Sequence, residues 1–190
     1  MHDQHTPMSI DVGSVLAPRQ LVDVAGTSTP VPDPERIVHL QFRRFAGCPI
    51  CNLHLRAIAL RHDEIAAAGV REVVIFHSDA PSLREYVVDV PFPLVADPKK
   101  RLYAEFGVET SVRAVLSPRA WAAGMRSAVV AGKRPWAGDR STGLLSLPAD
   151  FLIAPDGAVL AARHGRNAYD QWSVDELLAT VGELAPPRAA

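Results

Sequence analysis

The chain contains two cysteines, Cys48 and Cys51, which are three residues apart. They follow an apolar, strand-like run at residues 37–42 and open a segment with the apolar spacing of a helix. A cysteine in this position meets unpaired backbone N–H groups and the positive end of the helix dipole, which favour the thiolate. The spacing of three brings the second sulfur within disulfide range. We predict Cys48 as the nucleophile and Cys51 as the less exposed, resolving thiol.

The residues around the pair fit this interpretation. Pro49 takes one of the first helical positions, where its missing N–H costs nothing. Arg43 and Arg44 add positive potential if either side chain turns toward the sulfur. Two alternatives stay open. In the first, the cysteine pair is structural or accidental. In the second, it is half of a zinc site completed by histidines such as His54, although no second pair of ligands in the sequence has suitable spacing.

The elements that position the cysteines follow from periodicity and punctuation. We expect strands at residues 21–24, 37–42, 72–77, 92–96, 150–154 and 158–163. We expect helices at residues 48–68, 80–88, 99–106, 119–130 and 174–183, the last with a capping box from Ser173 to Glu176. The Pro-Asp-Gly turn at 155–157 predicts antiparallel pairing of the last two strands. This order indicates an α/β fold with a central mixed sheet flanked by helices.

We predict one domain, residues 13–190, after a disordered polar tail at residues 1–12. Residues 113–146 form a helical and loop insertion before the C-terminal hairpin. Within it, residues 113–140 hold six basic side chains and one acidic side chain. The insertion is a candidate surface for an acidic partner, an anion or a homodimer contact, and the alternative is a solvated lid.

Composition excludes several classes of protein. With 190 residues, 48% hydrophobic and 22% charged, the chain is an ordinary globular one. Its net charge of −1 gives no field for nucleic acid. We expect neither a membrane span nor a secretory signal, and we place the protein in the reducing cytoplasm. No glycine-rich nucleotide loop is present, so we expect no cofactor and electrons from another thiol.

Four stretches carry a resemblance to known proteins: FRRFAGCPICNLHLR, VVIFHSD, FPLVADPKKRLYAEFGV and LPADFLIAPDGAVL. The CxxC motif between strand and helix resembles the thioredoxin superfamily. The wider pattern resembles the peroxiredoxin-like branch of the AhpC/TSA antioxidant family. The resemblance implies a thioredoxin-like fold, a peroxidatic role for Cys48, a disulfide or peroxide substrate, and a thioredoxin- or glutathione-type electron donor.

The chain departs from the peroxiredoxin pattern beside the cysteines. Gln41 and Phe45 stand where peroxiredoxins have a proline and a threonine or serine. Pro148 stands where they have an arginine that polarises the peroxide. Thioredoxins have a proline at that place, so the resemblance implies a cis Pro148 that faces the cysteines and orients an incoming disulfide. The family pattern therefore suggests peroxide chemistry, whereas these residues favour disulfide exchange.

A proton acceptor for Cys51 is not evident. Phe42 stands where thioredoxins have a buried carboxylate. The candidates that remain are water, His54, His77 and Asp79. Asp79 is alternatively the N-cap of the following helix, and both histidines are alternatively packing or surface residues.

The sequence thus predicts a thiol–disulfide oxidoreductase that also has a route to peroxide reduction. Two alternatives share the same scaffold. One is a redox-sensing or binding module without turnover, and the other is a true thiol peroxidase that uses other peroxide-activating residues.

Overall fold

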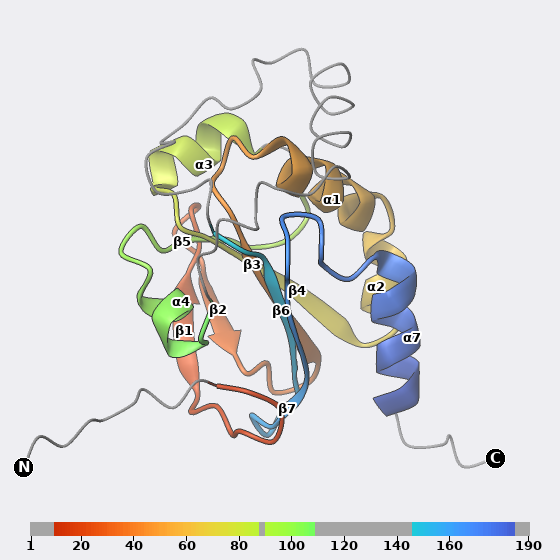
Figure 1. Ribbon diagram of the computed structural model, residues 1–190. Helices are drawn as coiled ribbons and strands as arrows, with labels where there is room; N and C mark the ends of the chain where they lie inside the picture. Colours follow the sequence, from red (N-terminus) through yellow and green to blue (C-terminus); the bar gives the residue numbers. More distant parts are fainter. Residues whose placement is uncertain (1–9, 88–89, 109–145, 185–190) are drawn as a thin grey trace, which may run out of the picture.

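The computed structural model describes residues 10–87, 90–108 and 146–184, and its centre is a five-stranded sheet (Figure 1). In spatial order the strands are β5 (Leu94–Ala96), β4 (Val70–Phe76), β3 (Ile37–Arg43), β6 (Ala149–Ile153) and β7 (Val159–His164). β4 runs parallel to β3 and to β5, whereas β6 runs antiparallel to β3 and to β7. The predicted mixed α/β sheet is confirmed.

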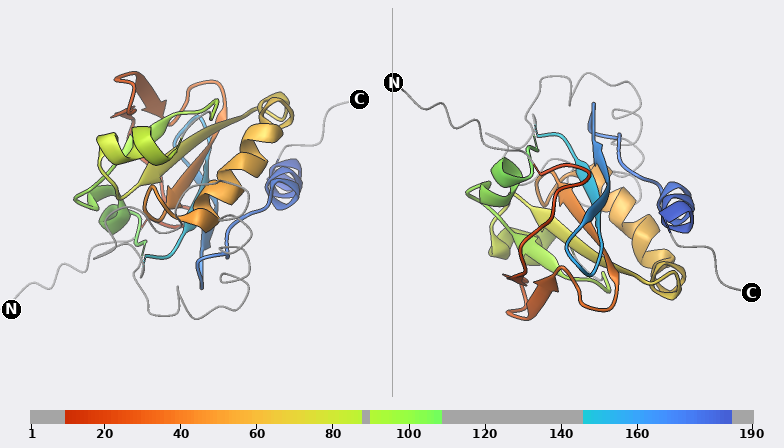
Figure 2. Two further views of the ribbon diagram at one scale, coloured as in Figure 1. Left: turned by 90° about the horizontal axis from the view of Figure 1, so that it is seen from above. Right: turned by 90° about the horizontal axis from the view of Figure 1, so that it is seen from below.

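Helices cover both faces of this sheet (Figure 2). The helices are α1 (Pro49–Leu60), α2 (His62–Ala67), α3 (Ala80–Tyr86), α4 (Arg101–Glu105) and α7 (Val174–Leu184). α1, α2 and α7 lie on one side of the sheet, while α4 lies on the other with a hairpin of β1 (Arg19–Val22) and β2 (Ser28–Val31). The capping box that starts α7 is present, since Ser173 and Glu176 exchange hydrogen bonds of 2.8 and 3.2 Å.

Several elements differ from the predictions, most clearly at three places. The single helix expected over residues 48–68 is divided at Arg61 into α1 and α2. The Arg61 guanidinium binds the carboxylates of Glu64 and Asp175. The strand expected at residues 21–24 lies earlier, as β1, and ends at Val22, because the Asp23 carboxylate closes a tight turn by accepting two backbone N–H groups; β2, where no strand was expected, follows this turn. The helix expected from residue 99 begins at Arg101, because Lys100 has a left-handed φ of 53°.

The turn between β6 and β7 also holds the N-terminal segment. Gly157 has a φ of 91°, and a Cβ atom there would lie 2.4 Å from the carbonyl oxygen of Leu16. The Leu16 N–H donates to the Gly157 carbonyl at 2.8 Å. Glycine is required at this place both for its conformation and for the close approach of the second backbone.

Alternation along β3 separates two cores. Val38, Leu40 and Phe42 pack on the α4 side. The opposite side, under α1 and α7, holds a second apolar cluster that includes both cysteines. Because side chains alternate along a strand, the intervening residues of β3 point to this cysteine-bearing side.

Some predictions fall on other parts of the chain. Residues 1–9 of the predicted tail, and residues 113–145 of the predicted basic insertion, lie outside the described residues. Ile10 is described; its N–H donates to Glu105 at 3.3 Å and its side chain packs against the core on the α4 side.

We predict that Phe151→Ala lowers the free energy of unfolding by about 3–5 kcal/mol, because a fully buried aromatic side chain is replaced by a cavity. The Phe151 ring lies 5.7 Å from Phe42 and 5.0 Å from Phe106. Urea denaturation measures the change. Leu60→Ala is the control: Leu60 is 87% exposed, and its loss is expected to change stability by less than about 0.5 kcal/mol. Similar effects of the two substitutions would contradict the assignment of this core.

Candidate active site

The two cysteines begin α1, as predicted. Cys48 is the N-cap residue with an extended backbone, and Pro49 follows in the first turn. The Cys48 sulfur accepts the backbone N–H of Cys51 at 3.4 Å, so it caps the helix as a serine or aspartate would. The Cys51 thiol donates to the same sulfur across an Sγ–Sγ distance of 2.8 Å. Both are free thiols, and the sulfurs lie within easy reach of a disulfide bond.

The sulfur atoms are hidden from solvent. Cys48 is 0% exposed and Cys51 is 1% exposed, so the prediction of a more exposed Cys48 is wrong. Both side chains belong to the apolar cluster that also contains Phe45 and Ile50. Packing of the loop before α1 against the helix therefore closes over both sulfurs alike.

Arg44 supplies a positive charge beside Cys48. Its Nη1 atom donates to the Cys48 sulfur at 3.8 Å, and its guanidinium lies 5.6 Å from the centre of the Phe45 ring. The side chain of Arg43, the preceding residue, points away from the sulfurs and pairs with Asp150 on the sheet. Of the two arginines, Arg44 therefore provides the positive potential that the sequence indicated.

These contacts separate the acidities of the two thiols. Burial alone would raise the pKa of Cys48, but the hydrogen bond from Cys51, the charge of Arg44 and the backbone N–H groups of the helix lower it to about 7. Burial and the neighbouring Cys48 raise the pKa of Cys51. Cys48 is therefore the better thiolate near neutral pH, while Cys51 keeps its proton.

The loop that carries Arg44 and Cys48 is held from three directions. The Tyr103 hydroxyl, from α4, donates to the carbonyl oxygen of Arg43. Ser78, after β4, accepts the N–H of Ala46 at 2.9 Å. The side-chain amide of Asn52, on α1, donates to the Ala46 carbonyl at 3.1 Å. The loop therefore has a defined conformation before any substrate binds.

Pro148 precedes β6, but its peptide bond is not cis. In the part of the chain that the structure describes, the only cis peptide is Val31–Pro32, so that prediction is wrong. The Pro148 carbonyl accepts the N–H of Gly165 at 2.9 Å, which continues the β6–β7 pairing into an extended trans segment. A contact between Pro148 and substrate stays a prediction.

The three proton-acceptor candidates lie in different settings. Asp79 is the N-cap of α3 and accepts the Ser82 N–H at 2.8 Å, which is its alternative, structural role. The His77 ring packs edge-on against Tyr103 at 5.7 Å. The Nε2 atom of His54 lies 3.1 Å from Nη2 of Arg43. Burial and the charge of Arg43 lower the pKa of His54, which makes it a poor base.

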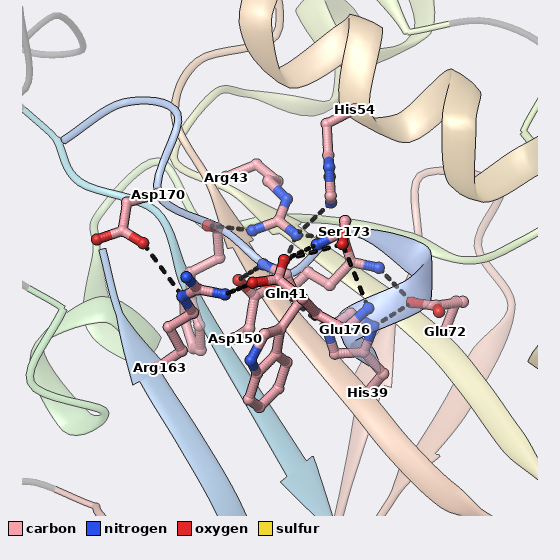
Figure 3. A network of polar contacts seen from close by, with 12 residues as sticks. His39, Gln41, Arg43, His54, Glu72, Asp150, Arg163, Asp170, Ser173 and Glu176 are labelled. Carbon is pink, nitrogen blue, oxygen red and sulfur yellow. Dashed lines mark hydrogen bonds and ion pairs between the residues drawn. The ribbon is translucent and has the colours of Figure 1, made fainter. Parts of the chain in front are cut away.

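A cluster of charged and polar side chains lies beneath α1 on the sheet face (Figure 3). We call it the buried charge cluster; its members, each 0% exposed, are His39, Gln41, Arg43, Glu72 and Asp150. Three come from alternate positions of β3, one from β4 and one from β6. The cluster therefore joins the three central strands of the sheet.

Each charge in this cluster has an opposite neighbour. Asp150 Oδ1 lies 2.6 Å from Nη2 of Arg43 and 3.1 Å from Nε2 of His39. His39 Nδ1 lies 2.8 Å from Oε2 of Glu72. The Gln41 amide donates to Glu72 and accepts from Arg43, so it links the two halves. A buried network needs this pairing, because a lone charge in the interior is strongly unfavourable.

Protonation of His39 completes the balance of charge. Burial alone would lower the pKa of His39, but the carboxylates of Glu72 and Asp150 raise it to about 9. Burial alone would raise the pKa of Asp150, but Arg43 and His39 lower it well below its ordinary value. Two cations thus face two anions at neutral pH.

The sequence predictions missed this cluster. Residues 37–42 were interpreted as a compact apolar strand, and Gln41 as a departure from a family proline. The available signal was the alternation of His39, Gln41 and Arg43, which places three polar side chains on one face of one strand. Their partners on β4 and β6 are distant in sequence, so their pairing required the register of the sheet.

The described residues include no group of three or more His, Cys, Asp or Glu side chains that could hold a metal ion. Among the helices described, none is long and apolar enough to cross a membrane.

Comparison with protein families gives a match over the middle and C-terminal parts of the chain. A family model described as AhpC/TSA antioxidant enzyme matches residues 57–167, which is more than half of the chain. The matched region begins after Cys51, so the match depends on the scaffold and not on the cysteine pair. No curated protein matches the sequence of the chain.

Solved structures of peroxiredoxins share the fold. The peroxidoxin BcpB of Mycobacterium tuberculosis is 20% identical, with a TM-score of 0.64 over 93% of this chain and 99% of that one. Peroxiredoxin 6 of Arenicola marina is 16% identical, with a TM-score of 0.68 over 93% and 74%. A yeast mitochondrial 1-Cys peroxiredoxin, whose thiol is resolved via glutathione and thioredoxin systems, is 13% identical, with a TM-score of 0.65 over 92% of this chain and 76% of that one.

We predict that the stability contributed by His39, measured as the difference in free energy of unfolding between the wild type and His39→Gln, is lost as the pH rises through about 9. The folded-state pKa of His39 is raised from 6.5 to about 9, so its stabilising effect is complete below pH 6.5 and disappears as the folded protein releases this proton. The loss is on the order of 3 kcal/mol. Urea denaturation at a series of pH values measures it.

His39→Gln, which has no titrating ring, is the control for this prediction. It is expected to be less stable than the wild type at neutral pH and to lack this part of the alkaline decline. A difference in stability between wild type and His39→Gln that stays constant from pH 6.5 through 9 would show that His39 is not held as a cation, because the opposite contribution of the lowered Cys48 pKa is common to both proteins.

Proposed function

The chain belongs to the AhpC/TSA antioxidant enzyme family, and we propose that it is a thiol–disulfide oxidoreductase with Cys48 and Cys51 as its redox centre. The observation that carries this proposal is the pair of sulfurs 2.8 Å apart at the start of α1, with Arg44 3.8 Å from the Cys48 sulfur. The hydrogen bond from Arg44 to the Cys48 sulfur gives the pair a direction, with Cys48 as the attacking thiolate and Cys51 as the resolving thiol.

Disulfide exchange follows in two balanced steps. The Cys48 thiolate attacks one sulfur of the substrate disulfide, that S–S bond breaks, and the leaving thiolate takes a proton from solvent. Cys51 then loses its proton and attacks the Cys48 sulfur, which releases the second substrate thiol and leaves a Cys48–Cys51 disulfide. An external dithiol or two molecules of a monothiol return the pair to the reduced state.

The same centre has a second candidate function, peroxide reduction, which the position of Arg44 and the burial of both sulfurs favour. A small oxidant fits a site with no exposed sulfur better than a protein disulfide does. The Cys48 thiolate would attack one peroxide oxygen, the O–O bond would break, and Cys48 would become a sulfenic acid while the leaving hydroxide takes a proton from solvent to form water. Attack by Cys51 then forms the disulfide and releases a second water. Arg44 would donate hydrogen bonds to the peroxide. It would thereby take the role of the arginine that peroxiredoxins have at the position of Pro148.

We further propose a thioredoxin- or glutathione-type electron donor, in view of the yeast relative that works with both systems. The sensor alternative uses the same dithiol without turnover. Turnover with either donor, followed with a disulfide and then with hydrogen peroxide as oxidant, separates enzyme from sensor.

We predict that Cys51→Ser traps a mixed disulfide on Cys48 when the reduced protein is mixed with oxidised glutathione. The nucleophile can still attack, but the thiol that resolves the adduct is gone. Mass spectrometry of the intact protein and of its peptides counts and locates the adduct. Cys48→Ser is the matched variant and is expected to form little adduct, because the raised pKa of Cys51 leaves it protonated. Preferential trapping on Cys51 would overturn the assignment of roles.

We predict that Arg44→Met slows oxidation of Cys48 by hydrogen peroxide by about 10- to 100-fold if peroxide is a substrate. The rates are compared by stopped flow at a pH above the pKa of Cys48 in both proteins, so that thiolate content is equal and the remaining difference reports peroxide activation. Arg56→Met, an exposed arginine of α1, is the control. Equal rates for wild type and Arg44→Met, both near that of an unactivated thiol, would leave disulfide exchange as the function.

A further inference from the structure

The buried charge cluster reaches α1 through His54. The Nη2 atom of Arg43 lies 3.1 Å from Nε2 of His54 (Figure 3). Neither residue has a part in the sulfur chemistry proposed above. The contact between Arg43 and His54 nevertheless lies close to the cysteine pair, since His54 is one helical turn beyond Cys51 and Arg43 is adjacent to Arg44.

The direction of this hydrogen bond is fixed by chemistry. A guanidinium has donors only, so Nε2 of His54 must be the acceptor and the ring must be neutral, with its proton on Nδ1. The lowered pKa of His54 agrees with a neutral ring. In this arrangement Nε2 is occupied and is not free to take a proton from Cys51.

Arg43 is a rigid partner for this acceptor. Its Nη2 atom, which carries two N–H groups, also lies 2.6 Å from Asp150 Oδ1 and 2.5 Å from Gln41 Oε1, so one hydrogen is shared between two of the three acceptors. Its carbonyl oxygen accepts the Tyr103 hydroxyl from the other side of the sheet. With side chain and main chain both held, Arg43 has little freedom to follow a movement of α1.

The contacts form a closed ring around the redox centre. Arg43 binds His54, and α1 connects His54 back to Cys51 and Cys48. The Cys48 sulfur accepts from Arg44, which is the next residue after Arg43. Because residues three apart lie on one face of a helix, Cys51 and His54 face the same strand end. Loss of the His54 contact would therefore let α1 shift against Arg44.

We propose that His54 is a positioning residue of the redox centre: as a neutral acceptor for Arg43, it fixes α1 on the buried charge cluster and thereby fixes the Cys48 sulfur against Arg44. This inference rests on the proposed role of Cys48 as the thiolate. It concerns a residue that touches neither sulfur nor substrate, and it replaces the role of proton acceptor for which His54 was a candidate.

The test compares His54→Leu with His54→Gln. Both remove the titrating ring without changing the charge at neutral pH, but the glutamine oxygen reaches the place of Nε2 and can accept from Arg43, whereas leucine cannot. The readout is the pH dependence of Cys48 alkylation by iodoacetamide, with the modified residue identified by mass spectrometry. We expect His54→Leu to lower the alkylation rate at about pH 6 by about three- to tenfold through a raised pKa of Cys48, and His54→Gln to restore it.

His62→Leu is the matched control, since His62 is a half-buried histidine of the next helix whose ring contacts Phe92 rather than Arg43. It is expected to leave the profile of Cys48 unchanged. If His54→Leu fails to fold, His54→Asn, which is too short to reach Arg43, takes its place with the same expectation.

Three outcomes would overturn the inference. An unchanged profile in His54→Leu would show that the contact does not position the sulfur. Equal impairment in His54→Leu and His54→Gln would indicate that the imidazole itself is needed, as for a base. An equal shift in His62→Leu would indicate a general loosening of the helices. A wild-type Cys48 with the pKa of an ordinary thiol would instead contradict the proposed function, and the inference would fall with it.

Discussion

The ion pair between Arg43 and Asp150 is the contact on which the rest of this molecule depends. Both side chains are fully buried, and their atoms are 2.6 Å apart. Removing one partner from such a pair typically costs about 3–5 kcal/mol, since it leaves an uncompensated charge in the interior. Asp150 also accepts the backbone N–H of Trp172 at 3.3 Å, so the pair joins β3, β6 and the segment that leads into α7.

Two adjacent arginines have separate tasks because a strand alternates its side chains. Arg43 is the last residue of β3 and points into the buried charge cluster, where its charge is cancelled. Arg44 is the first residue beyond the strand and points to the Cys48 sulfur. The redox centre therefore receives the cation of Arg44, whose guanidinium donates to the Cys48 sulfur. A one-residue shift in this register would exchange the two environments and leave Cys48 without its donor.

Local patterns predicted what depends on local chemistry. The position of the cysteines at the start of a helix follows from the apolar run before them and from Pro49, and the antiparallel β6–β7 pair follows from its Pro-Asp-Gly turn. Their burial did not follow, because it depends on how a loop packs against a helix. Gln41 shows the limit most clearly: taken alone it is a departure from a motif, and only the partner strands turn it into a bridge between Glu72 and Arg43.

Trp172 gives the buried charge cluster an optical reporter. Its ring lies 5.7 Å from that of His39, at an interplanar angle of 45°, and only 8% of its surface is exposed. An imidazolium quenches indole fluorescence more strongly than a neutral imidazole does, so the emission of this side chain carries information on the charge of His39. In a variant that keeps Trp172 as its single tryptophan, the protonation state of an interior with no solvent contact can thus be followed by light, without any added label.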